Sequence, residues 1–205
     1  MLYDYILGNF EKGEPFFLAE LPGTSRDYVR QEMKKLTDEG KIERLYNGVY
    51  YLPYLTVLGT KGRISVEKYI EKRYICPNGE IEGYVTGIQL ANDLGLTTQN
   101  PSCYEVCSNE ATTKQRKTQI DGRNIIIYKP LTRITEENAS ALQFLDLMTT
   151  VDKYSELTGE RLKKKLNVIV DYLALDFDIV KKYLELYPDK VYKNIYQGGL
   201  MGELV

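Results

Sequence analysis

The sequence contains no histidine and no tryptophan, and only three cysteines among its 205 residues. Without histidine, neither a Ser-His-Asp nor a Cys-His arrangement can form, and the commonest general base is missing. Phosphate-binding loops of the GxxxxGK[ST] and GxGxxG types are also absent. We therefore expect that the chain is not an enzyme and carries no cofactor.

Metal binding is not expected either. Cys76, Cys103 and Cys107 follow no zinc-binding spacing, and no histidine is present to complete a site. An odd number of cysteines fits a chain that keeps its thiols reduced, as intracellular proteins do.

Long apolar runs are missing as well. No run approaches the roughly 20 residues that a membrane-spanning helix needs. Residues 2–10 are amphipathic, are interrupted by Asp4 and lack the basic start of a signal peptide. With a net charge of −2, we expect a cytoplasmic protein with no membrane partner.

A capped amphipathic helix is predicted between Thr24 and Gly40. The hydroxyl of Thr24 or Ser25 can accept a backbone N–H of the first turn, and Gly40 can take the left-handed conformation that often ends a helix. Apolar residues recur at helical spacing and form one stripe, so the opposite face is polar. The stripe consists of Val29, Met33 and Leu36.

The neighbours of this helix predict a winged helix-turn-helix. A shorter helix is expected before the turn at Pro22-Gly23. After Gly40 the apolar period changes to two around Asn47-Gly48, a dipeptide typical of tight hairpin turns. A short helix, a turn, a longer helix and a hairpin in this order indicate a module that places its longer helix in the DNA major groove.

The charge of this segment leaves the partner open. Residues 1–53 hold seven Lys and Arg against nine Asp and Glu, so no net positive charge attracts phosphate. Winged helices also serve as protein-interaction modules, and the acidic balance favours that alternative, an adaptor without DNA binding. Basic residues nevertheless gather on the longer helix and the hairpin and predict a local basic face: Arg26, Arg30, Lys34, Lys35, Lys41 and Arg44.

The rest of the chain predicts a larger, mixed domain. Strands are expected at residues 104–108 and 125–128, with a hairpin turn at Asp121-Gly122. Residues 54–133 carry eleven Lys and Arg against eight Asp and Glu, a surplus that could meet nucleic acid or an acidic partner.

The predicted fold class is therefore α+β, with two domains. The first is the winged helix-turn-helix at residues 1–53. The second is an α+β domain at residues 54–205, which is mixed over 54–133 and forms a helical layer over 134–205.

Two motifs carry a resemblance to a known family. The first is Gly40-Lys41-Ile42 with the hairpin Asn47-Gly48-Val49-Tyr50-Tyr51, a pattern shared by many regulators. The second and more specific motif is Gly87-Ile88, Asn92, Leu94-Gly95-Leu96-Thr97-Thr98-Gln99 and Pro101. Together they resemble the AbiEi-type antitoxins, which are transcriptional regulators of type IV toxin–antitoxin systems. The resemblance covers about residues 15–130, and the helical tail has no counterpart in it.

The resemblance implies two roles. In such proteins the winged helix binds repeats in the operon's own promoter and represses it, and the C-terminal domain counters a toxin of the nucleotidyltransferase type without a stable complex. The expected partners are therefore double-stranded DNA, bound by a monomer or dimer on repeated sites, and such a toxin. The implied DNA contacts are Ser25, Arg26, Tyr28, Gln31, Lys35, Arg44 and Asn47, to which the polar helix face adds Arg30 and Lys34.

Overall fold

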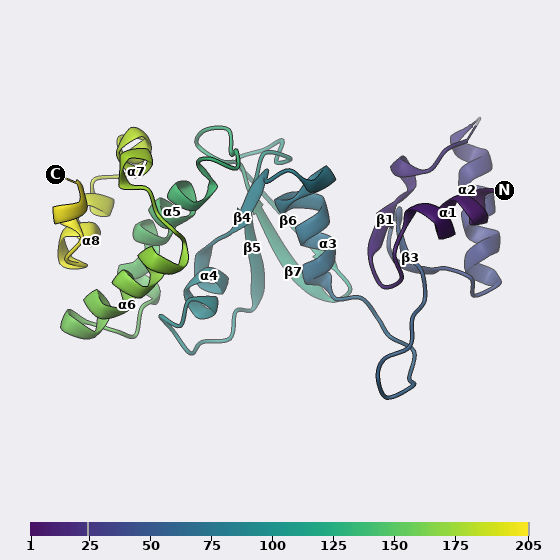
Figure 1. Cartoon of the computed structure of the whole chain (residues 1–205), viewed down its shortest axis with the longest axis horizontal. Coiled ribbons are helices and arrows are strands. Elements are labelled where there is room, and N and C mark those ends of the chain that lie inside the picture. Colours follow the sequence, from purple (N-terminus) through teal and green to yellow (C-terminus); the bar gives the residue numbers. More distant parts are fainter. Residues whose placement is uncertain (24, 205) are drawn as a thin grey trace. The chain divides into compact units, whose positions relative to one another are not determined.

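The computed structural model describes residues 1–23 and 25–204, which form two compact units (Figure 1). Unit 1 comprises Met1–Lys72 and Ile120–Gly122, and unit 2 comprises Arg73–Gln119 and the described residues from Arg123 onward. Both units combine helices with a sheet, which confirms the predicted α+β class.

Unit 1 contains a three-stranded antiparallel sheet in the order β1-β3-β2. The β2–β3 hairpin turns at Asn47-Gly48, where Gly48 has a φ of 77°. The elements of this unit are α1 (Leu2–Asn9), β1 (Pro15–Phe17), a 3₁₀ turn (Leu18–Glu20), α2 (Arg26–Asp38), β2 (Glu43–Tyr46), β3 (Val49–Tyr51) and α3 (Val66–Ile70).

Helix α2 begins and ends where its sequence signals predict. The Oγ atom of Ser25 accepts the Tyr28 N–H at 3.2 Å, while the alternative cap, Thr24, lies outside the described residues. Gly40 follows the helix with a φ of 68°, a left-handed conformation that favours glycine. The predicted apolar stripe of α2 is buried in a core that it shares with Ile6 and Phe16.

The short helix expected before Pro22 is largely absent. Pro15–Phe17 instead forms strand β1, which pairs with β3 in the register Phe16 to Tyr50, and only a single 3₁₀ turn follows it. Phe16 is fully buried in this position. Pairing with a strand more than 30 residues away decides the conformation here, and that partner leaves no local signal.

Packing places the segment after the hairpin in unit 1, whereas the sequence suggested a domain boundary after Pro53. The Tyr69 ring of α3 lies near the rings of Phe17 and Tyr46, with centroid distances of 6.1 and 6.4 Å. Lys68 donates to the Glu14 carboxylate and to the Gly13 carbonyl. Helix α3 therefore belongs structurally to the N-terminal unit.

Unit 2 contains a four-stranded sheet in the order β4-β5-β7-β6. Strand β4 is antiparallel to β5, and β5 is parallel to β7. The predicted turn at Asp121-Gly122 joins β6 to β7, and both of its residues have positive φ. The strands are β4 (Gly83–Val85), β5 (Cys103–Ser108), β6 (Gln115–Ile120) and β7 (Arg123–Tyr128), and the helix α4 (Gly87–Asp93) follows β4.

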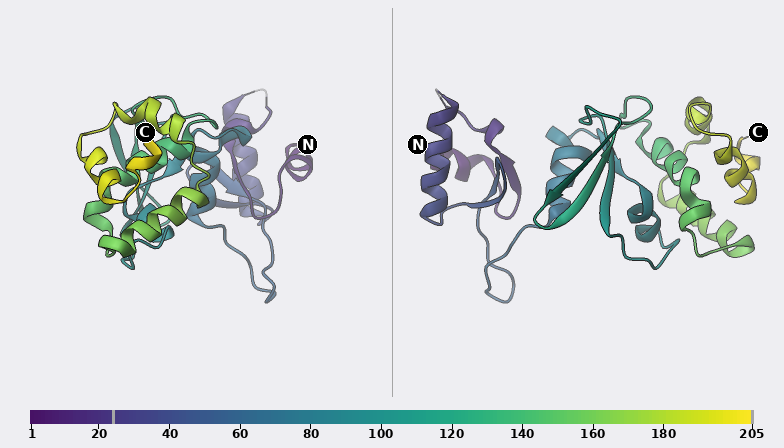
Figure 2. Two further views of the ribbon diagram at one scale, coloured as in Figure 1. Left: turned by 60° about the vertical axis from the view of Figure 1, so that its left-hand side comes forward. Right: turned by 180° about the vertical axis from the view of Figure 1, so that it is seen from behind.

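The C-terminal helices of unit 2 gather around α5 (Figures 1 and 2). One apolar core joins them to β4, α4 and β5, with Phe144 and Leu145 of α5 fully buried. Tyr187 and Asn194 donate to the α5 carbonyls of Leu142 and Met148, at 3.3 and 2.7 Å. The helices are α5 (Ala139–Tyr154), α6 (Gly159–Tyr172), α7 (Phe177–Leu184) and α8 (Lys190–Gln197).

Candidate functional site

The residues predicted to contact DNA all have exposed side chains. They lie at the start of α2, along α2 and on the β2–β3 hairpin of unit 1 (Figure 1). Arg26, Arg30 and Lys34 follow one another at four-residue spacing, so they form one row along the helix. The full set is Ser25, Arg26, Tyr28, Arg30, Gln31, Lys34, Lys35, Arg44 and Asn47, and we call it the α2–hairpin surface.

Two arginines of the α2–hairpin surface are held by neighbouring oxygen atoms. Arg26 donates to the Leu18 carbonyl at 3.0 Å, across the turn that precedes α2. Arg44 donates to Asn47 Oδ1 at 2.6 Å and to the Tyr46 carbonyl at 3.2 Å. These bonds use only part of each guanidinium, which has five N–H donors, so both groups can still bind an acceptor.

The other basic side chains of unit 1 are mostly neutralised by nearby acids. Among the described residues, five basic side chains of this unit take part in no ion pair: Lys12, Arg26, Lys34, Lys35 and Arg44. Four of these five belong to the α2–hairpin surface. Within the α2–hairpin surface Arg30 pairs with Asp27, and the ion pairs formed elsewhere in unit 1 are Lys41–Glu39, Lys61–Glu43, Arg63–Asp121, Lys68–Glu14 and Lys72–Glu20.

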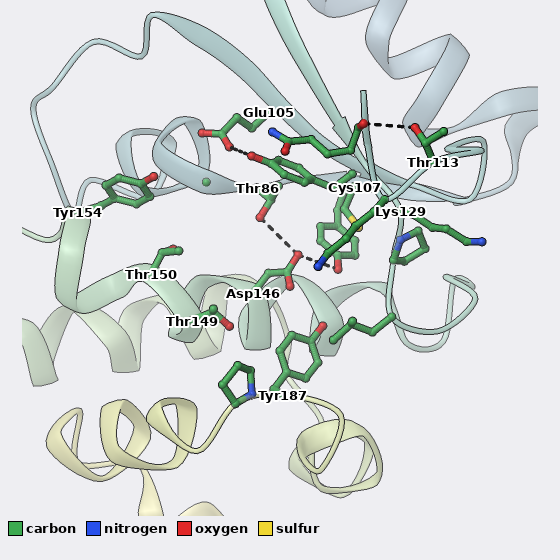
Figure 3. A pocket seen from close by; sticks show the side chains of 18 residues that line it. Thr86, Glu105, Cys107, Thr113, Lys129, Asp146, Thr149, Thr150, Tyr154 and Tyr187 are labelled. Carbon is green, nitrogen blue, oxygen red and sulfur yellow. Dashed lines mark hydrogen bonds between the residues drawn. The ribbon is translucent and has the colours of Figure 1, made fainter. Parts of the chain in front are cut away.

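Unit 2 contains a pocket with a volume of about 810 Å³ (Figure 3). Its floor consists mostly of buried polar side chains, and its rim carries exposed ones, including two lysines. Sequence reasoning missed this pocket because its walls come from β4, β5, the ends of the β6–β7 hairpin, α5 and the segment after α7. The floor is formed by the buried residues Tyr84, Thr86, Glu105, Cys107 and Tyr187 and by the partly exposed Asp146.

Asp146 is the central carboxylate of this floor. Its Oδ2 atom accepts hydrogen bonds from the Tyr84 hydroxyl at 3.0 Å and the Thr86 hydroxyl at 3.4 Å, as Figure 3 shows. Burial raises the pKa of Asp146 from 3.8 to about 6, although these donors oppose the rise. Thr86 stands directly before α4, but its hydroxyl donates to Asp146 instead of capping that helix.

A second carboxylate, Glu105, lies at the start of α4. It accepts the Tyr128 hydroxyl at 2.8 Å and the Ile88 N–H at 3.4 Å. A Cβ atom at Gly87 would collide with this carboxylate, and Gly87 has a φ of 65°, so glycine is needed here for both reasons. Burial raises the pKa of the neighbouring Cys107 thiol to about 12, which keeps the thiol protonated and a poor nucleophile.

The motif Leu96-Thr97-Thr98 has a structural role outside the pocket. Glu156, in the loop after α5, accepts the Thr97 hydroxyl at 2.7 Å and the Thr98 N–H at 3.0 Å. The Glu156 N–H donates in turn to the Leu96 carbonyl at 2.9 Å. The hydrogen bonds from Thr97 and Thr98 hold the pKa of Glu156 below its usual range. We call this arrangement the Thr–Glu clip.

The described residues form neither a metal-ligand cluster nor a membrane-spanning helix. No three Cys, Asp or Glu side chains among them come together as metal ligands would. None of the helices that they form combines the length and apolar character needed to cross a membrane. No protein-family model matches the chain, and no curated protein matches it.

Proposed function

We propose that unit 1 is a winged helix-turn-helix that binds double-stranded DNA, with α2 in the major groove and the β2–β3 hairpin as the wing. The observation that carries this proposal is the distribution of ion pairs. Acidic neighbours neutralise most basic side chains of unit 1 but leave Arg26, Lys34, Lys35 and Arg44 without an ion pair among the described residues. Positive charge is therefore concentrated where a duplex would meet α2 and the hairpin.

The order of elements supports the same proposal. A helix, a strand, a short turn, a longer capped helix and a two-stranded hairpin follow one another within residues 2–51. The polar face of α2 also offers side chains that can read bases, because Gln and Arg make paired hydrogen bonds to base edges. Gln31 is exposed, and among the described residues no side chain or backbone group hydrogen-bonds to its amide.

We further propose that the chain represses its own operon and acts as the antitoxin of a type IV toxin–antitoxin system against a nucleotidyltransferase toxin. The motif in residues 87–101 supports this assignment by its resemblance to the AbiEi-type antitoxins. The competing function is a protein-interaction adaptor, which the acidic balance of residues 1–53 favours.

Removing two cations from α2 is expected to weaken DNA binding and its salt dependence. The wild-type chain should bind its own upstream DNA more tightly than a scrambled fragment, with log K falling by about 0.9 per phosphate contact for each unit of log salt. The double variant Lys34→Ala/Lys35→Ala should reduce that slope by about 1.8, because two phosphate contacts are lost. Fluorescence anisotropy titrations at several salt concentrations measure both quantities.

The matched control for this titration is Lys12→Ala. Lys12 is exposed and takes part in no ion pair among the described residues, but it lies between α1 and β1. Its replacement should leave affinity and slope unchanged. If Lys12→Ala lowers DNA affinity as much as Lys34→Ala/Lys35→Ala does, binding reflects general charge attraction and not contact through α2. If the wild-type chain does not prefer its own upstream DNA over the scrambled fragment, the protein-interaction adaptor becomes the favoured function.

Gln31→Ala is expected to lose discrimination at one base position. The lost pair of hydrogen bonds should cost about 1–3 kcal/mol on the preferred sequence and little on a sequence altered at that base. Lys34→Ala serves as the contrast, since a phosphate contact should weaken all sequences alike. Titrations against a set of single-base operator variants would reveal the difference, and uniform weakening by Gln31→Ala would remove this residue from base reading.

A further inference from the structure

In the pocket of unit 2, acidic and basic side chains lie at different depths. Two carboxylates, Asp146 and Glu105, lie at the floor, and two lysines, Lys114 and Lys129, lie at the rim. We propose that this pocket binds a nucleotide, with the N–H donors of its base at Asp146 and its phosphate at the two lysines. This ligand is distinct from the duplex proposed for unit 1.

Asp146 has acceptor capacity that the protein does not use. An ionised carboxylate can accept about four hydrogen bonds. The Tyr84 and Thr86 hydroxyls supply two, and both of these end on Oδ2. The Tyr187 hydroxyl donates to the Leu142 carbonyl at 3.3 Å and is also close enough to Asp146 to lower its pKa by hydrogen bonding, so it can fill at most one further acceptor position. A ligand that enters the pocket can therefore place its own donors on Asp146.

The rim lysines are held next to each other by the backbone. Lys114 precedes β6 and Lys129 follows β7, and the Lys129 N–H donates to the Lys114 carbonyl at 3.2 Å. Figure 3 shows the Lys129 side chain reaching over the floor. Among the described residues, neither lysine forms an ion pair, and both are exposed, so the pair can meet an anionic group.

The walls between floor and rim suit a flat, partly apolar ring. Tyr128 and Tyr154 line the pocket with partly exposed rings, and aromatic side chains stack on bases of any kind. The volume of about 810 Å³ falls in the range of roughly 300–1,000 Å³ that is usual for small-molecule sites.

Other ligand classes match only part of this arrangement. A polyamine would satisfy the carboxylates but not the lysines, and inorganic phosphate would satisfy only the lysines. A nucleotide satisfies both ends at once. Guanine is the base that fits best, because its ring N–H and its amino group lie side by side and can both donate to Oδ1, the oxygen of Asp146 that the Tyr84 and Thr86 hydroxyls leave free.

The test is a calorimetric titration of the full chain with GMP, IMP, guanosine and spermidine, and with a guanine-ended RNA trinucleotide. GMP is expected to bind saturably and at least tenfold more tightly than IMP, which lacks the amino group. Guanosine should bind more weakly than GMP because it lacks the phosphate. If the trinucleotide binds and GMP does not, the proposed site stands, and its ligand is a nucleotide at the end of an RNA strand.

Two sets of variants locate the binding. Asp146→Asn should weaken GMP binding at least tenfold, because one of its two acceptor oxygens becomes a donor. Lys114→Ala/Lys129→Ala should weaken GMP binding but leave guanosine binding unchanged, a split that misfolding would not produce. The control is Lys117→Ala, an exposed lysine of β6 that does not line the pocket.

Three results would overturn the proposal. The first is no binding of GMP or of the trinucleotide at millimolar concentration. The second is binding that both the Asp146 and the lysine variants leave unchanged. The third is tighter binding of spermidine than of any nucleotide. None of these bears on promoter binding by unit 1, so the two proposals fail separately.

Discussion

Asp146→Asn is expected to raise the free energy of unfolding at pH 7.5 and to keep only about a third of that gain at pH 4.5. Burial raises the folded-state pKa of Asp146 from 3.8 to about 6. Between these two values the folded chain holds a proton that the unfolded chain has released, so wild-type stability falls as pH rises. The full cost, roughly 3 kcal/mol, is present above about pH 6.

The asparagine variant avoids this cost and keeps the local contacts. Its amide oxygen can still accept the Tyr84 and Thr86 hydroxyls, while its amino group faces the pocket. The titratable and charged groups that face Asp146 from the surrounding elements are unchanged in the variant. They are Tyr84 on β4, Cys107 and Glu105 on β5, Lys129 after β7 and Tyr187 after α7.

Urea denaturation of both proteins at pH 4.5, 6.0 and 7.5 measures this effect. The informative quantity is the difference between variant and wild type, because all other titrating groups cancel in it. Asp152→Asn, an exposed position on the same helix, is the matched control and should show no change in that difference with pH. If the difference in free energy of unfolding between Asp146→Asn and wild type does not change with pH, ionisation of the wild-type Asp146 carboxylate does not destabilise the fold.

Gly83→Ala is expected to destabilise unit 2 by about 3 kcal/mol or more. A Cβ atom at this position would collide with the backbone oxygen of Tyr74 and lie 2.7 Å from the backbone oxygen of Cys107. Neither atom can rotate away as a flexible side chain could. Strand β4 would have to leave its place against β5, and the Tyr84 hydroxyl would move with it.

The control for Gly83→Ala is Gly202→Ala. A Cβ atom at Gly202 would meet nothing within 4 Å, and this glycine has no positive φ. Its replacement should leave the urea midpoint unchanged, while Gly83→Ala should lower it strongly and also weaken GMP binding. Equal midpoints for the two variants would mean that β4 shifts at little cost.

Local signals account for the parts of the fold that the sequence predicted. Ser25 and Gly40 bound α2, and the Asp121-Gly122 turn separates β6 from β7. Strand β1 was mistaken for a helix because its conformation depends on pairing with β3. The conformation of a segment that is fixed by a distant partner cannot be read from its own few residues.

The candidate sites divide in the same way. The helical period of α2 predicts which of its side chains are exposed, so the α2 residues of the α2–hairpin surface could be identified as candidates from the sequence. Their contact with DNA stays a prediction. Asp146 could not be chosen, because its partners Tyr84 and Thr86 are 62 and 60 residues away. The only available signal was an acidic residue, Asp146, flanked by apolar residues in the middle of α5.

The Thr–Glu clip changes what its sequence motif can tell about related chains. Thr97 and Thr98 bind a carboxylate 58 to 59 positions further along, and no ligand is needed to explain their presence. The motif is then the signature of a junction between two loops, and it should vary together with an acidic residue just after the long helix. A chain that has the threonines but lacks that acid would have the motif without the junction. Judging relatedness from the motif alone would then overestimate how similar the two structures are.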